Sequence, residues 1–174
     1  GRVEFTPFKK KHIRYMKPVK KVLVVGGAGY LGSILIRKLL KRGYKVRVLD
    51  NLTYGDEGIR NINHENFEFI RGDIRDLTKV VEAVKDTDAV IHLAAIVGDP
   101  ACALDPEETI EINYLATKTL VETCKYFQIN RFVFASTCSV YGATAGENEL
   151  TEESKLNPVS LYARSKIECE NAIL

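Results

Sequence analysis

The sequence predicts an α/β protein with a doubly wound parallel sheet of about five strands flanked by helices. Short runs rich in β-branched residues alternate along the chain with longer segments of helical periodicity. Stacked βαβ units around a parallel sheet produce this order. In addition, the first run leads directly into a glycine-rich turn that opens a helix.

Five short apolar runs are the expected strands. They cover Lys21–Gly26, Lys45–Asp50, Phe67–Gly72, Ala89–Ala94 and Arg131–Ser136. The segments Val22–Val25 and Phe132–Phe134 are continuously apolar, without alternating polar residues. Strands buried on both faces have this composition, so helices are expected on both sides of the sheet.

Helical patterns separate the expected strands. They cover Tyr30–Arg42, a short segment at Asp56–Ile62, Leu77–Lys85 and the long segment Pro106–Phe127. The long segment places Ile110, Tyr114 and Leu120 at helical spacing, which predicts one apolar stripe against the sheet. Gly43 follows the first helix where a C-cap glycine is expected.

The character of the chain changes after the fifth strand. Residues 137–157 are rich in glycine, serine and acids, which predicts a loop long enough to be functional. A final helix is expected to begin near Ser160. Ile173 and Leu174, the last two residues of the sequence, are apolar and still follow the periodicity of this helix.

Length and composition are those of one globular domain. The chain has 174 residues, of which 45% are hydrophobic and 28% charged. It contains no apolar run of membrane-spanning length and opens with no signal-peptide pattern, so no membrane partner is expected. The four cysteines have neither CxxC nor metal-ligand spacing. We therefore expect reduced thiols, no metal site and a cytoplasmic location.

The net charge of +2 is unevenly distributed. Residues 1–15 contain five basic residues and one acid, which leaves −2 for the remainder. We expect residues 1–15 to be a flexible basic extension, either native or a tag, and residues 16–174 to be the folded domain. The run Lys9–Lys11 could contact a nucleic acid or a membrane, but a solvated tail is favoured and no nucleic-acid partner is expected.

The glycine-rich turn has the composition of a phosphate-binding loop. Gly26, Gly29 and Gly32 have the spacing GxxGxxG directly after a strand and at the start of a helix. Gly26 permits a tight turn, Gly29 lets the backbone approach a pyrophosphate, and Gly32 allows close helix packing. The helix N-terminus favours the phosphate charge.

Acidic residues follow the second and third strands. Asp50, 18 residues after Gly32, could accept hydrogen bonds from both ribose hydroxyls of an adenosine and would repel a 2′-phosphate. Asn51 stands where an NADP enzyme often has arginine, so NAD is favoured over NADP; alternatively, Asp50 only caps a turn. Asp73 could accept from the adenine amino group, and Asp76 could cap the next helix.

Two further positions are ambiguous from the sequence. His92 stands inside an apolar strand and is expected to be a satisfied core residue. Thr137 lies in a hydroxyl-rich turn after the fifth strand, where it could bind a substrate hydroxyl. Ser136 and Ser139, in the same turn, are equally well explained as local turn residues. Cys138 has no histidine nearby in sequence to activate it.

Tyr162 and Lys166 form the candidate acid/base pair. Their spacing of four places both side chains on one face of the final helix. A lysine ammonium beside the phenol lowers its pKa, which is near 10 in isolation. The pair can therefore transfer a proton, although a Tyr-x-x-x-Lys spacing also occurs by chance.

Taken together, these motifs resemble the extended short-chain dehydrogenases/reductases. They are most similar to the NAD-dependent epimerase/dehydratase branch, which acts on nucleotide sugars. The motifs follow in the family's order: Gly26-x-x-Gly29-x-x-Gly32, Asp50-Asn51-Leu52, Gly72-Asp73, His92-Leu-Ala-Ala95, Asn113, Ser136-Thr137, Val140-Tyr-Gly142 and Tyr162-x-x-x-Lys166. The resemblance extends from Lys21 to about Leu174 and implies a Rossmann-type fold.

The resemblance also implies a mechanism and a set of site residues. Tyr162 takes a proton from a sugar hydroxyl, and Lys166 holds the nicotinamide ribose. Thr137 forms a hydrogen bond with the same sugar hydroxyl. The keto sugar is then re-reduced on its opposite face, which is epimerisation by tightly held NAD. The implied cofactor residues are Gly26, Gly29, Tyr30, Leu31, Gly32, Asp50, Asn51, Asp73, Ile74, Leu93, Ala94, Ala95, Asn113 and Lys166.

The sequence departs from the family in two respects. Cys138 and Ser139 replace the acidic pair that 4,6-dehydratases carry after the threonine, which argues against dehydration. Asp99 and Cys102, after the fourth strand, have no assigned role. Family members also continue into a C-terminal substrate domain, so we expect this chain to be truncated, with that domain absent, and to be poorly active alone.

Three functional hypotheses follow. The first is an NAD-dependent nucleotide-sugar 4-epimerase that forms a homodimer, since the family pairs its long helix with the Tyr/Lys helix. The second is an NAD(P)H-dependent reductase of a carbonyl or keto sugar with the same fold. The third, a non-catalytic NAD-binding protein, would not need Thr137, Tyr162 and Lys166 in register.

Overall fold

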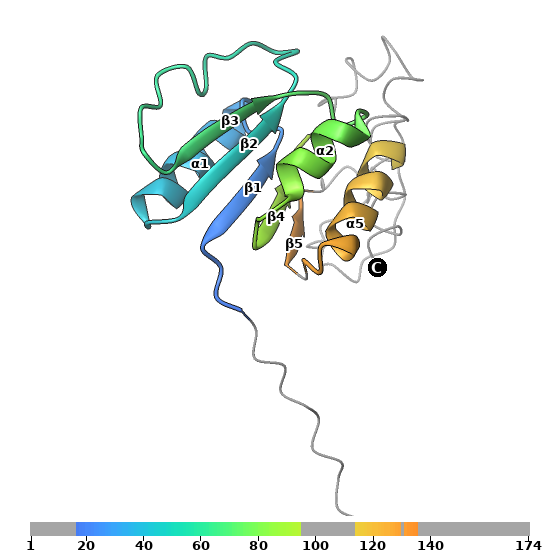
Figure 1. Cartoon of the computed structure of the whole chain (residues 1–174). Helices are drawn as coiled ribbons and strands as arrows, with labels where there is room; N and C mark the ends of the chain where they lie inside the picture. The colour runs from blue at the N-terminus through green and yellow to red at the C-terminus, as the bar shows by residue number, and fades with distance from the viewer. Residues whose placement is uncertain (1–16, 95–113, 130, 136–174) are drawn as a thin grey trace, which may run out of the picture.

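A five-stranded parallel sheet forms the centre of the chain in this computed structural model, which describes residues 17–94, 114–129 and 131–135. The strands lie in the order β3-β2-β1-β4-β5, and every neighbouring pair is parallel (Figure 1). Their bounds are β1 Lys21–Val25, β2 Lys45–Asp50, β3 Phe67–Arg71, β4 Ala89–His92 and β5 Phe132–Phe134. The predicted sheet is thus confirmed, with some strands ending one to two residues earlier than expected.

The strand order reverses direction at the centre of the sheet. After β1, the chain builds β2 and β3 on one side and then returns to place β4 and β5 on the other. Val25 at the end of β1 pairs with both Leu49 and His92. The carboxyl ends of β1 and β4 therefore meet at the switch point, where open α/β sheets bind their ligands.

The central strands form because their residues suit burial on both faces. Val22–Val25 of β1 and Val46–Leu49 of β2 are all buried, whereas β3 at the edge alternates in exposure. β-Branched residues pack well on a pleated surface, and parallel pairing requires helices on both sides.

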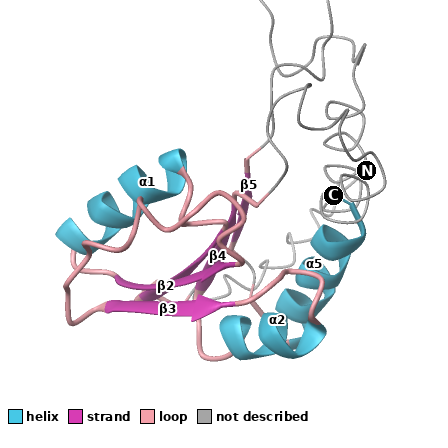
Figure 2. Ribbon diagram, turned by 90° about the horizontal axis from the view of Figure 1, so that it is seen from above, coloured by secondary structure: helices cyan, strands magenta, loops and turns pink. Residues whose placement is uncertain are grey.

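Helices cover both faces of the sheet. Helix α1 (Tyr30–Lys41) lies on one face, and α2 (Leu77–Val84) and α5 (Ala116–Tyr126) lie on the other (Figure 2). In the part of α5 that the structure describes, the predicted apolar stripe is confirmed, with Leu120 and Cys124 buried. The first residues of the predicted Pro106–Phe127 helix lie outside the described ranges.

The ends of the helices follow from local chemistry. Asp76 caps α2 as predicted, because its Oδ1 accepts from the backbone N–H of Thr78 at 2.9 Å. Gly43, at φ +87°, ends α1, and the N–H groups of Gly43 and Tyr44 donate to the carbonyls of Leu40 and Leu39. Residues 56–62 form hydrogen-bonded turns instead of the short helix that the sequence suggested.

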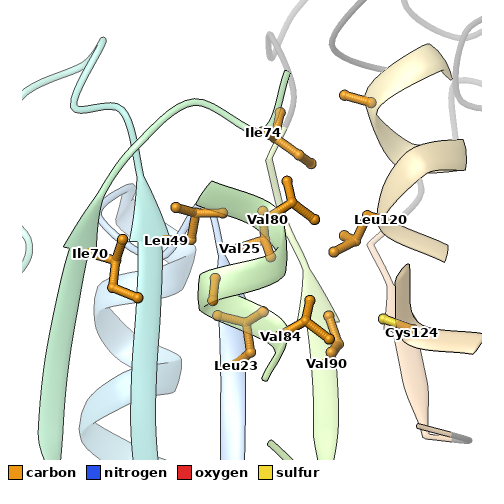
Figure 3. Packing of buried hydrophobic residues seen from close by; sticks show 12 residues of the cluster. Leu23, Val25, Leu49, Ile70, Ile74, Val80, Val84, Val90, Leu120 and Cys124 are labelled. Carbon is orange, nitrogen blue, oxygen red and sulfur yellow. The ribbon is translucent and has the colours of Figure 1, made fainter. Parts of the chain in front are cut away.

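Two hydrophobic clusters fill the space on either side of the sheet. The cluster under α2 and α5 includes Leu23, Val80, Val84 and Leu120 (Figure 3). The cluster under α1 includes Val24, Ile36 and Val48, with Ile59 contributed by the turn region after β2. None of the described helices has the length and apolar character that crossing a membrane requires.

His92 connects β4 to α5 within the core. Its side chain is fully buried, and its Nε2 lies 2.7 Å from Oγ1 of Thr117. The rings of Phe132 and Phe134 pack beside it. His92 is thus a core residue with a polar partner, as the sequence predicts.

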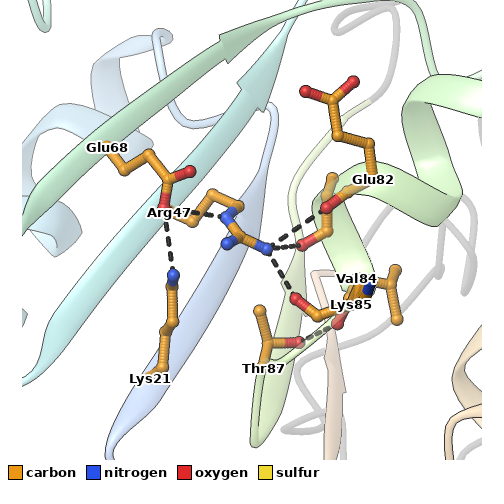
Figure 4. A network of polar contacts seen from close by, with 8 residues as sticks. Lys21, Arg47, Glu68, Glu82, Val84, Lys85 and Thr87 are labelled. Carbon is orange, nitrogen blue, oxygen red and sulfur yellow. Dashed lines mark hydrogen bonds and ion pairs between the residues drawn. The ribbon is translucent and has the colours of Figure 1, made fainter.

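A buried arginine binds the C-terminus of α2. Arg47, on β2, is 8% exposed, and its Nη1 donates to the carbonyls of Glu82, Ala83 and Lys85 at 3.2, 2.8 and 2.7 Å (Figure 4). The last carbonyls of a helix have no intrahelical donors and carry partial negative charge. Helix α2 has no basic residue in its own last turn, so Arg47 supplies the cation.

Glu68 on β3 completes this network. Its Oε2 accepts from Arg47 Nε and from Lys21 Nζ, each at 3.0 Å. Burial raises the pKa of Glu68, but these hydrogen bonds and charges outweigh it and leave the pKa below its ordinary value. The network therefore links β1, β2, β3 and α2 at the amino end of the sheet.

Replacing Arg47 with methionine is expected to lower the free energy of unfolding by about 3 kcal/mol, because buried carbonyls lose their donor. Equilibrium unfolding in urea measures the loss. Arg60→Met at an exposed position is the matched control and should change stability by less than about 0.5 kcal/mol. Equal losses in the two variants would contradict a specific role for Arg47.

Candidate nucleotide site

The glycine loop between β1 and α1 lies against the end of β4. Gly26 has φ +82°, and its N–H donates to the carbonyl of Leu49 at 2.8 Å. A Cβ at Gly26 would lie 2.6 Å from the backbone nitrogen of Ala94. Only glycine can combine this conformation with this approach, so the predicted turn role of Gly26 is confirmed.

Two other glycines allow close packing around the loop, one at the start of α1 and one against β2. A Cβ at Gly32 would lie 2.5 Å from the carbonyl oxygen of Gly27, as its predicted packing role requires. Gly27, which the motif did not single out, faces Val48, whose Cγ1 would lie 2.8 Å from a Cβ. The doubled glycine was the available sequence signal for Gly27.

The first turn of α1 leaves backbone N–H groups without partners inside the helix. Gly29 is the N-cap residue in an extended conformation, and no side chain caps α1 or contributes an acid to its first turn. The nearest atom to a Cβ at Gly29 would be 3.8 Å away. Tyr30 and Leu31 are exposed at this end. Uncapped N–H groups and the helix dipole suit a pyrophosphate.

Asp50 holds the glycine loop and the turn after β2 together. Its Oδ2 accepts from the N–H of Ala28 at 3.0 Å, and its Oδ1 accepts from the N–H of Leu52 at 2.7 Å. The turn-capping alternative is therefore real, but each carboxylate oxygen has room for a second donor. Leu52 adopts φ +61°, a strained conformation that the Asp50 contact stabilises.

Asn51 and Asp73 meet across the ends of β2 and β3. Asn51 Oδ1 accepts from the N–H and the hydroxyl of Thr53 at 3.0 and 2.7 Å. Its Nδ2 donates to Oδ2 of Asp73 at 3.3 Å. The adjacent N–H of Gly72 donates to the carbonyl of Asp50 at 3.1 Å. The two acidic residues predicted for the site thus lie on neighbouring strand ends.

Arg75 forms an ion pair with Asp73. Its Nε and Nη2 donate to Oδ1 and Oδ2 of Asp73 at 2.9 and 2.8 Å, and its backbone N–H donates to Oδ1 at 2.9 Å. These hydrogen bonds lower the pKa of Asp73 to about 2. Asp73 is therefore ionised at neutral pH. Reasoning from the sequence alone missed Arg75, although its place two residues after Asp73 was a signal.

The turn region after β2 packs over the glycine loop. Arg37 on α1 donates through Nη1 to the carbonyls of Ser33 and Gly58, at 3.0 and 2.9 Å. A Cβ at Gly58 would lie 2.6 Å from the carbonyl oxygen of Ala28. Gly58 and Arg37 therefore support the loop, and no motif in the sequence marked either of them.

The remaining predicted residues divide into a group that the structure describes and a group that it does not. In the first group, Leu93 and Ala94 lie at the end of β4 beside Gly26. Ile74, also in this group, is buried in the core, so that only its backbone can meet a ligand. The other group lies outside the described residues: Ala95, Asn113, Thr137, Tyr162 and Lys166. The structure thus brings together the predicted residues that follow β1, β2, β3 and β4.

Comparison with known proteins gives a consistent result. A family model described as the NAD-dependent epimerase/dehydratase family matches residues 22–174. A putative UDP-glucose 4-epimerase of Methanocaldococcus jannaschii is 38% identical over 83% of this chain and 47% of its own length. A dTDP-D-glucose 4,6-dehydratase of Dictyostelium discoideum is 34% identical, with coverage of 89% and 40%.

A solved structure supports the same similarity. The UDP-glucose 4-epimerase of Thermus thermophilus in complex with NAD superposes with a TM-score of 0.79 at 35% identity. The match covers 87% of this chain and 49% of that chain. The chain therefore spans about half the length of the relatives it matches.

Gly26→Ala is expected to destabilise the chain by at least about 2 kcal/mol more than Gly43→Ala. Both glycines have positive φ, and that conformation costs an alanine about 1–2 kcal/mol. Nothing lies within 4 Å of a Cβ at Gly43, whereas Gly26 adds the collision with Ala94. Urea unfolding of both variants checks the prediction. Similar losses would show that the close approach contributes nothing.

Proposed function

Because the chain belongs to the NAD-dependent epimerase/dehydratase family, we propose that it provides the NAD-binding half and the acid/base residues of a nucleotide-sugar epimerase. One observation carries the proposal. The uncapped N-terminus of α1 opens beside Asp50, at the point where the strand order reverses. In this unit, residues 16–174 form the folded domain, and residues 1–15 remain an extension.

The cofactor site follows from the contacts described. The pyrophosphate binds the N–H groups of Tyr30, Leu31 and Gly32, which Gly29 leaves accessible. Asp50 accepts from the adenosine ribose hydroxyls through its remaining lone pairs and repels a 2′-phosphate. Asn51 and Asp73 lie toward the adenine. The other cofactor contacts come from the backbone of Ile74 and from Leu93, Ala94, Ala95, Asn113 and Lys166.

The proposed chemistry rests on residues outside the described ranges. When bound, NAD supplies the acceptor and later the donor of a hydride. Tyr162 accepts the proton of a sugar hydroxyl while hydride leaves the carbon that bears it, and Lys166 keeps the phenol acidic. Thr137 orients the hydroxyl. Returning hydride to the opposite face of the carbonyl carbon, and a proton to its oxygen, would invert the carbon with no net redox change.

Relatives of this chain differ in the reaction they are named for, so the choice of reaction needs its own argument. The 4,6-dehydratase relative shows that similarity to the family does not by itself select epimerisation. Cys138 and Ser139 follow Thr137 in place of an acidic pair, which disfavours dehydration. Net reduction of a keto sugar is the second candidate. Stoichiometric consumption of NADH would favour it over the cofactor-neutral epimerase.

A homodimer through α5 is part of the proposal. A groove of about 430 Å³ between α2 and α5 is lined by Leu77, Val81 and Tyr126, of which Tyr126 is 81% exposed. Lys118 and Glu122, one helical turn apart, also line it. When two α5 helices pack antiparallel about a two-fold axis, each Lys118 faces the partner's Glu122, so the surface is complementary to itself.

The same proposal places the protein in the cytoplasm with no nucleic-acid partner. Its support is that Cys124, within the described residues, is a buried free thiol, and that the sequence has no CxxC spacing. Fractionation of cells with an antibody to the chain tests the location.

Tyr162→Phe is expected to lower epimerisation by at least about 10³-fold, because the phenylalanine has no proton to exchange. The assay uses the polypeptide of the complete reading frame and a panel of nucleotide sugars. NAD affinity should change by less than about threefold, since Tyr162 acts on the sugar. Unaltered turnover in this variant would remove the proposed base.

Lys118→Glu is expected to weaken self-association by at least about tenfold, because it places like charges opposite each other across the two-fold axis. The double variant Lys118→Glu/Glu122→Lys exchanges the charges and should restore the association. Sedimentation equilibrium measures both, with Ile34→Glu on α1 as control. A double variant as weak as the single variant would contradict this interface.

A further inference from the structure

Among the described residues, four donors reach the Asp73 carboxylate, and Arg75 contributes three of them. The guanidinium meets both oxygens at 2.9 and 2.8 Å, and the backbone N–H adds a third hydrogen bond at 2.9 Å. A planar fork that contacts both oxygens sets the rotation of a carboxylate, which a single donor does not. The orientation of Asp73 is therefore determined mainly by Arg75.

We propose that Arg75 is a positioning residue that holds the Asp73 carboxylate in the orientation needed to accept a hydrogen bond from the 6-amino group of adenine. The proposal rests on the NAD site described above. It extends that site by assigning recognition of the adenine base to Asp73 and Arg75 together. The Asn51 amide is the donor to Asp73 that the adenine amino group replaces.

The backbone beneath the pair is well anchored. Ile74, between the two residues, is 6% exposed and packs in the core under α2. The N–H of Asp76 donates to the carbonyl of Asp73 at 3.0 Å, and Asp76 itself caps α2. The ion pair is thus built on a turn that is tied to the core on one side and to a helix on the other.

Asn51 marks the direction from which a ligand can approach. Its Nδ2 makes the longest of the four contacts, 3.3 Å to Asp73 Oδ2. Two donors per oxygen use the lone pairs of the carboxylate, so a further donor must replace one of them. The Asn51 amide is the weakest contact and is itself held through Oδ1 by Thr53. An adenine amino group can therefore take the place of the Asn51 amide.

The ion pair also solves an electrostatic problem. Asp50 and Asp73 lie at neighbouring strand ends, and a pyrophosphate is proposed to bind nearby. Two uncompensated carboxylates would repel such a ligand. Arg75 pairs with Asp73, which stays ionised as its lowered pKa indicates, so that the acceptor is kept and the repulsion is reduced.

The test compares two dinucleotides that differ at one group. The probes are NAD and nicotinamide hypoxanthine dinucleotide, in which an oxo group replaces the 6-amino group, and binding is measured by titration calorimetry. Wild type should prefer NAD by about tenfold, the value of one hydrogen bond to a charged acceptor. Arg75→Met should reduce this preference to about twofold or less.

Two further variants keep the interpretation specific. Arg75→Lys retains the charge but not the fork, so its preference should lie between wild type and Arg75→Met. Asp73→Asn offers an amide N–H to the oxo group, and its preference should fall to one or below. Arg60→Met is the matched control and should leave the preference unchanged.

The outcomes separate this inference from the function on which it rests. If wild type binds neither dinucleotide, the proposed NAD site is wrong. If wild type binds both dinucleotides equally, the NAD site is supported, but Asp73 does not recognise the adenine amino group. If Arg75→Met weakens both dinucleotides by the same factor, Arg75 is only structural and the inference is overturned.

Discussion

The contact between the glycine loop and the end of β4 is the constraint on which the rest of the site depends. At Gly26 the main chain passes so close to Ala94 that no side chain fits. This approach places the N-terminus of α1 at the carboxyl edge of β1 and β4, where the strand order reverses. A larger residue would displace the helix and, with it, the backbone N–H groups of its first turn.

The two carboxylates at this edge of the sheet have different hydrogen-bond partners. Asp50 uses one lone pair on each oxygen to hold the loop and the following turn, and each oxygen has room for a second donor. Asp73 is matched by Arg75 and remains ionised. The edge therefore carries two carboxylates, one of which is paired with an arginine.

Polar residues inside the layers hold the helices that support the site. Arg47 crosses from β2 to the C-terminus of α2, and His92 connects β4 to Thr117 on α5. Each makes these contacts within a buried environment, so removing one partner leaves the other without compensation. Burial of apolar surface brings the layers together, and these contacts select one arrangement of helices over the sheet.

The sequence by itself determined the five parallel strands, the first helices and the order of the motifs, because periodicity and glycine spacing are local properties. It also identified Gly26, Asp50 and Asp73. Only the tertiary structure decided what surrounds them: Arg75 on Asp73, Gly27 against Val48, and Arg37 beside Gly58. The contacts of Gly27 and Arg37 join residues that are far apart in the sequence, whereas the Arg75 contact is local and depends on the conformation of the turn after β3. The signals in the sequence were the doubled glycine and the arginine two residues after Asp73. The turns at residues 56–62 differ from the expected helix for the same reason, since Ile59 is buried under α1 and Gly58 packs on Ala28.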